Sequence, residues 1–128
     1  MRTTFAARLF GALVLLVAAF QLALAAGAPW GSLAMGGAYP GRFPPPMRVA
    51  AVVQAVVLLV FGAIVAARAG LALPRWRAAS RKLVWVVVAC TAVGAVLNTI
   101  TPSPLERAIW LPVTLALGIC AVVVARGE

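Results

Sequence analysis

Between Arg48 and Arg68 the chain reads VAAVVQAVVLLVFGAIVAA, residues 49–67, and this stretch contains no charged residue. A helix rises about 1.5 Å per residue, so about 17–25 apolar residues are enough to cross the hydrocarbon core of a bilayer. The stretch has that length, and it therefore predicts a helix that spans a membrane.

Apolar runs of similar length lie on both sides of this one. We expect four spans, at about residues 9–28, 48–67, 83–101 and 104–125. Gly70 is placed to cap the second helix, and Pro74 prevents its continuation. Ser103 and Glu106 form an S-x-x-E capping box with Pro104 at the first helical position, where the fourth helix should begin. The sequence thus predicts an all-α membrane protein, a single four-helix transmembrane bundle over residues 1–128.

The composition agrees with a membrane protein and excludes most catalytic chemistry. Of the 128 residues, 65% are hydrophobic and 10% are charged, whereas a soluble domain is near half apolar and a quarter charged. The chain has no His and no Asp, and its acidic residues are Glu106 and Glu128. Most metal sites, Ser-His-Asp or Cys-His arrangements and paired-carboxylate mechanisms are thereby excluded. We expect no enzyme, no cofactor and no metal.

The distribution of positive charge predicts the topology. Eight of the eleven Lys and Arg residues lie at the termini or in the second connection, and three, at positions 42, 48 and 107, lie on the opposite side. Cations collect in loops that stay in the cytoplasm, so both termini are expected inside. The net charge of +9 is spread between apolar runs instead of along one polar face, so we expect no nucleic-acid partner.

The second connection is the most basic part of the chain. Its five cations are Arg68, Arg75, Arg77, Arg81 and Lys82. We expect them to hold anionic lipid headgroups on the cytoplasmic side, at about 1 kcal/mol per cation. The same cluster could dock an acidic cytoplasmic partner.

The N-terminus allows a second interpretation. Arg2 and Arg8, an apolar stretch to Phe20 and then Ala23-Leu24-Ala25 are typical of a secretory signal with an A-x-A cleavage site. The apolar run continues through that site to Ala28. We therefore expect the first span to be retained, with cleavage as the alternative.

Three amide side chains lie at similar depth in the predicted spans. Gln21 and Gln54 are each seven residues from the outer helix ends, about 10 Å deep, and Asn98 is about 5 Å deep. One interpretation is hydrogen bonding between helices, worth about 0.6 kcal/mol per bond. The other is a polar pocket open to the outer side, because unpaired amides that face lipid would cost too much.

The first connection, residues 29–46, is rich in Pro and Gly and carries Trp30, Tyr39 and Phe43. It is expected to be an ordered loop that lies over the bundle, because Gly permits tight reversals and Pro removes donors. Residues 44–46 are expected to form stiff polyproline that leads into the second helix. If the amides line a pocket, Trp30 and Tyr39 are candidates for ligand contact.

The chain carries several short motifs: Trp30-Gly31, Gly36-Gly37, the Pro-rich stretch 43–48, residues 98–107 and Trp110-Leu111-Pro112. As an arrangement the chain resembles small four-helix inner-membrane protein families of bacteria that have no established activity. The resemblance implies a fold and a location in the bacterial plasma (inner) membrane only. Four-helix drug exporters are similar in span count, but they depend on an acid in the first helix, where this chain has Gln21.

Two functions follow from these observations. The first is a non-enzymatic accessory or structural membrane protein that packs against itself or a larger membrane partner. The alternative is a small-molecule binding or transport module that uses the outer amides. A polar stripe that continued to the inner face would favour transport, and Thr91 and Thr114 alone lie deeper.

The topology can be tested by cysteine labelling. With cytoplasmic termini, position 38 is outside and position 79 is inside. In intact cells an impermeant thiol reagent should therefore label an Ala38→Cys variant and leave an Ala79→Cys variant unlabelled. The opposite pattern would show that the topology is inverted.

Overall fold

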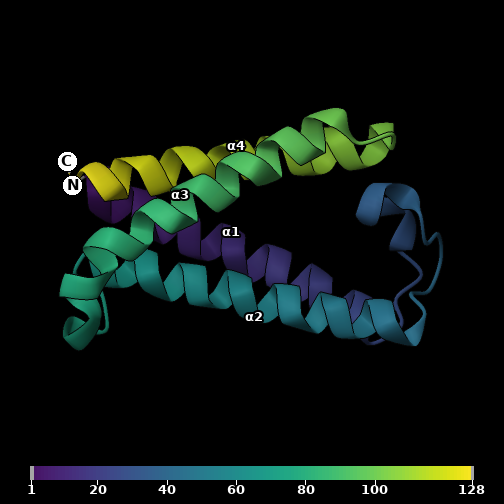
Figure 1. Ribbon diagram of the computed structural model, residues 1–128, viewed down its shortest axis with the longest axis horizontal. Helices are drawn as coiled ribbons and strands as arrows, with labels where there is room; N and C mark the ends of the chain where they lie inside the picture. Colours follow the sequence, from purple (N-terminus) through teal and green to yellow (C-terminus); the bar gives the residue numbers. More distant parts are fainter. Residues whose placement is uncertain (1, 128) are drawn as a thin grey trace.

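The computed structural model describes residues 2–127, and this part of the chain is all-helical (Figure 1). Four long helices are α1 (Arg2–Ala25), α2 (Pro45–Arg68), α3 (Arg77–Ile100) and α4 (Pro104–Arg126), and three short 3-10 helices are η1 (Gly31–Leu33), η2 (Met35–Gly37) and η3 (Pro74–Trp76). Each long helix has the length and apolar composition needed to cross a membrane. The prediction of a four-helix membrane fold is confirmed at this level.

The helices end where the local chemistry of the sequence requires. Gly70 has a φ of +77°, and the Leu71 N–H donates to the Ala66 carbonyl at 2.9 Å, which satisfies a carbonyl at the end of α2 as expected. Gly27, with a φ of +104°, ends α1 in the same way. At the start of α4, the Ser103 hydroxyl accepts from the Glu106 N–H at 3.2 Å.

The expectation of polyproline over residues 44–46 is wrong for two of the three prolines. Pro44 is extended, with a φ of −66° and a ψ of 159°, but Pro45 and Pro46 form the first turn of α2. The first helical N–H groups have no partner within a helix, so proline loses nothing there and its fixed φ suits the helix.

The helices pack as two antiparallel pairs, α1 with α2 and α3 with α4 (Figure 1). Both termini lie at one end, the terminal end, together with the connection 69–76. The pairs spread apart toward the opposite end, where the connection 26–44, here called the lid, folds back beside the start of α4. We call this opposite end the lid end.

The buried core is divided along the bundle. The larger cluster fills the terminal half, and its most deeply buried side chains include Phe10, Val65, Val84 and Val124. A small cluster lies at the lid end, formed by Leu24, Ala34, Phe43 and Ala51. Between the two clusters the helices carry the predicted amides.

One glycine holds the lid in its folded shape. The Gly31 N–H donates to the Gly41 carbonyl at 2.8 Å, so the lid closes on itself. A Cβ at position 31 would overlap the carbonyl oxygen of Tyr39 and lie 2.7 Å from that of Gly41. Backbone atoms cannot move aside as a flexible side chain would, and glycine is therefore required.

We expect Gly31→Ala to lower the free energy of unfolding by about 1–3 kcal/mol, because the lid must open to admit the methyl group. The matched control is Gly11→Ala in α1, where an added Cβ meets nothing within 4 Å. That control should leave stability unchanged or raise it by about 0.5–1 kcal/mol. Unfolding in mixed detergent micelles, followed by circular dichroism, measures both. Equal effects of the two variants would contradict the role of Gly31.

Candidate functional site

A cavity of about 610 Å³ lies at the lid end, between the two helix pairs. All four long helices line it, together with lid residues 33–36 and residues 101–102 of the turn between α3 and α4. Its volume is within the range of about 300–1,000 Å³ that is usual for small-molecule sites. We call it the lid-end cavity.

The three predicted amides all line this cavity. Gln21 comes from α1, Gln54 from α2 and Asn98 from α3. The Asn98 amide donates to the Gly94 carbonyl of its own helix at 2.9 Å. Among residues 2–127 no hydrogen bond joins the three amides to one another. The structure thus brings them to one wall without pairing them.

The two aromatic residues predicted as ligand contacts lie elsewhere in the lid. Trp30 stacks on Phe20 with ring centroids 6.1 Å apart and an angle of 9° between the rings. Tyr39 packs edge-on against Phe43, also at 6.1 Å. Neither Trp30 nor Tyr39 is part of the cavity wall. The Trp30 contact holds the lid to the end of α1, and the Tyr39 contact lies within the lid.

Trp110 has a larger part in the site than its sequence position indicated. It lines the cavity, and its indole N–H donates to the Leu33 carbonyl of the lid at 2.7 Å. Its ring also packs against Phe20 of α1 at 4.7 Å. A weaker contact, from the Ser103 hydroxyl to the Ser32 carbonyl at 3.4 Å, joins the lid to the turn before α4. The lid is thus tied to both helix pairs.

Glu106 is the functional candidate that the sequence interpretation missed, because it assigned this residue to the capping box alone. It is only 8% exposed and lines the cavity. Its Oε2 accepts from the Thr101 hydroxyl at 3.1 Å, and the Ser103 N–H, the usual partner in a capping box, donates to the Thr101 hydroxyl at 3.4 Å instead. The signal in the sequence was its isolation: within residues 2–127 it is the single acidic residue.

The five cations of the second connection differ in their surroundings. The guanidinium of Arg68 is half-buried and donates to the Ala125 carbonyl at 3.3 Å, where a cation is favourable at the C-terminal end of α4. The remaining four, at positions 75, 77, 81 and 82, are exposed at the terminal end. Contact of these residues with lipid headgroups stays a prediction.

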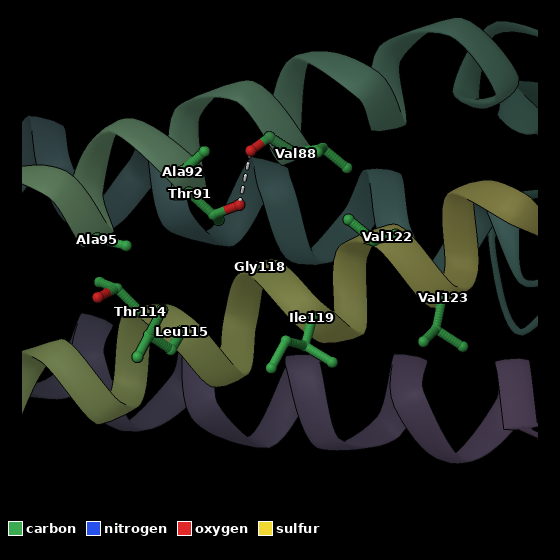
Figure 2. A pocket seen from close by; sticks show the side chains of 10 residues that line it. All are labelled: Val88, Thr91, Ala92, Ala95, Thr114, Leu115, Gly118, Ile119, Val122 and Val123. Atoms are coloured by element: carbon green, nitrogen blue, oxygen red, sulfur yellow. Dashed lines mark hydrogen bonds between the residues drawn. The ribbon is translucent and has the colours of Figure 1, made fainter.

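A second hollow, a groove of about 350 Å³ between α3 and α4, offers almost no polar surface (Figure 2). The Thr91 hydroxyl turns back to the carbonyls of Val87 and Val88 at 2.9 and 3.0 Å. Thr114 does the same with Trp110 and Leu111 at 2.8 and 3.1 Å. Both hydroxyl groups are thus occupied within their own helices, and the lid-end cavity is the stronger candidate.

Comparison with protein-family models, with curated proteins and with solved structures finds no match to this chain. Within residues 2–127 no group of three or more His, Cys, Asp or Glu side chains is placed to hold a metal ion. The geometry and chemistry of the lid-end cavity are therefore the observations that bear on the function of this protein.

A double-mutant cycle tests whether the amides act separately. Because Gln21 and Gln54 share no hydrogen bond, Gln21→Leu and Gln54→Leu should each change the free energy of unfolding by less than about 0.5 kcal/mol. The double variant should equal their sum within about 0.5 kcal/mol. As a control, Thr101→Val removes the bond to the Glu106 carboxylate and should cost about 1–3 kcal/mol. A larger coupling between the glutamines would mean that they bond directly.

Proposed function

We propose that this protein is a non-enzymatic integral membrane protein that binds a small amphiphilic molecule in the lid-end cavity. We place it in the inner membrane of a bacterium, with both termini in the cytoplasm and the lid outside. The observation that carries the proposal is that three amides and a carboxylate, from all four helices, line one cavity. Such a wall is costly in a membrane protein unless the polar groups have a use.

The chemistry of the wall indicates an amphiphile. Its apolar part includes Val17, Leu58, Val113 and Leu117, which suit a hydrocarbon body. The amides supply donors and acceptors for a polar head, because each offers two N–H groups and a carbonyl oxygen. A site that is mostly apolar with a few convergent polar groups is typical of small-molecule binding.

The core of the terminal half favours binding over conduction. Side chains that close the bundle beyond the cavity, such as Val14, Val87 and Ala121, are apolar and nearly inaccessible. Buried polar residues in the described part are few: Ser80, Thr91, Thr101 and Glu106. The serine and the first threonine are bonded to carbonyls of their own helix. A continuous polar path to the terminal end therefore has no support in these contacts.

The other expectation, an accessory protein that packs against itself or a larger membrane partner, stays a prediction. The structure contributes to it only exposed apolar side chains on the outer faces of the helices, such as Leu15, Val56 and Val93. Every multi-span protein presents such side chains to lipid.

Quenching of Trp110 fluorescence tests the proposed site. We would replace Trp30, Trp76 and Trp85 by Phe and reconstitute the protein in lipid nanodiscs. A decanol with bromine on the third carbon from its head group is the probe, since bromine quenches an indole on contact and the bound head lies near Trp110. Because Trp110 lines the cavity, its quenching should saturate with probe concentration. A second variant that keeps only Trp85, which is exposed and outside the cavity wall, reports the probe dissolved in lipid and should not saturate.

A matched pair of substitutions assigns the quenching to the cavity. Gln54→Phe fills the cavity from α2, whereas Val53→Phe enlarges its exposed neighbour, which lies outside the wall. The first should remove the saturable quenching, and the second should retain it. Quenching of Trp110 that rises without saturation, as for Trp85, would contradict the proposed function.

A further inference from the structure

We propose that the lid-end cavity selects a cationic amphiphile, an apolar body with a protonated amine, and that Glu106 is the residue that binds the charge. This inference rests on the proposed function and names the class of its ligand. It depends on the surroundings of one carboxylate.

Within residues 2–127, Glu106 has no cationic partner. The guanidinium of its neighbour Arg107 donates a hydrogen bond to the Thr101 carbonyl at 2.6 Å and forms no ion pair with the Glu106 carboxylate. No ion pair involving Glu106 is formed within residues 2–127. A buried carboxylate without a cation is expensive, and such groups are usually paired or bind a ligand.

One oxygen of Glu106 remains available to a ligand. Oε2 accepts the Thr101 hydroxyl, whereas Oε1 forms no hydrogen bond within residues 2–127 and keeps some accessible surface. Glu106 belongs to the cavity wall, so this oxygen is the one that a ligand in the cavity could reach. A carboxylate can accept about four hydrogen bonds. The position at the start of α4 favours its negative charge, since a helix N-terminus carries a partial positive charge.

Aromatic rings complete the surroundings of the carboxylate. Trp110 is one helical turn along α4 from Glu106, and its ring packs against Phe20 at 4.7 Å, with both rings in the cavity wall. Aromatic faces attract ammonium groups. The amides add carbonyl oxygens that accept from N–H donors. A carboxylate, two aromatic rings and amide oxygens favour an ammonium head and disfavour an anionic one.

The test compares three brominated decyl probes that differ only in the head group: an ammonium, an alcohol and a carboxylate. At pH 7 the amine is protonated, as a lysine is. Affinity is read from the saturable quenching of Trp110. In the wild-type cavity the ammonium probe should bind about tenfold more tightly than the alcohol, and the carboxylate more weakly than either.

Glu106→Gln tests the origin of this preference. The amide oxygen of glutamine can still accept the Thr101 hydroxyl, so the helix start is preserved while the charge is lost. The variant should bind the ammonium probe about tenfold more weakly and the alcohol unchanged. Taking the ratio of wild type to variant for each probe cancels the partition of that probe into lipid.

Four results are possible. An ammonium preference that disappears in Glu106→Gln supports the inference. Saturable binding with equal affinity for ammonium and alcohol overturns the inference. An ammonium preference that survives the substitution overturns it as well. In both cases the proposed function still stands. Absence of saturable quenching for every probe overturns the proposed function itself. The three-probe comparison uses unsubstituted Glu106, so equal affinities for ammonium and alcohol would overturn the inference even if the variant does not fold.

Discussion

The contact between α1 and α4 changes character along its length, and the shape of the bundle depends on that change. Near the termini the buried cluster that both helices share includes four alanines, Ala6 and Ala7 on α1 and Ala121 and Ala125 on α4. Small side chains let helix backbones approach closely in a membrane. At the other end the rings of Phe20 and Trp110 lie between them. Small residues at one end and aromatic rings at the other spread the helix pairs apart and leave room for the cavity.

The lid is part of the fold and not an appendage to it. Its interior is closed by the hydrogen bond from Gly31 to Gly41 and sealed by the buried ring of Phe43. The lid is joined to α4 through the Leu33 carbonyl, which accepts from the Trp110 indole N–H. Buried backbone groups must find hydrogen-bond partners inside the protein. A loop rich in Gly and Pro has fewer donors to satisfy and more freedom to turn, and it therefore suits a position over the mouth of the bundle.

The carboxylate of Glu106 gives the lid-end cavity a negatively charged group at one place in its wall. Capping alone requires a hydroxyl at Ser103, and the helix would begin at Pro104 without a buried charge. The chain nevertheless places a carboxylate where it contacts the Thr101 hydroxyl on one side and the cavity on the other. The same turn thus combines a structural bond with an acceptor oxygen that has no partner among residues 2–127. This combination is what distinguishes the lid-end cavity from the apolar groove between α3 and α4.

The sequence alone determined the four helices, because runs of apolar residues between charges and capping residues have one stable form in a bilayer. It also indicated the helix ends at Gly70 and Pro104 and the similar depth of Gln21, Gln54 and Asn98, since depth follows from counting residues along a helix. The sequence did not determine which helix faces pack together, because alanine is so frequent that lines of small residues along a helix occur by chance. Only the tertiary structure decided that the amides line one cavity without pairing, that Trp30 and Tyr39 lie outside its wall, and that Glu106 faces it. These facts depend on how far apart the helix pairs stand, and that distance is set by contacts between residues far apart in the chain.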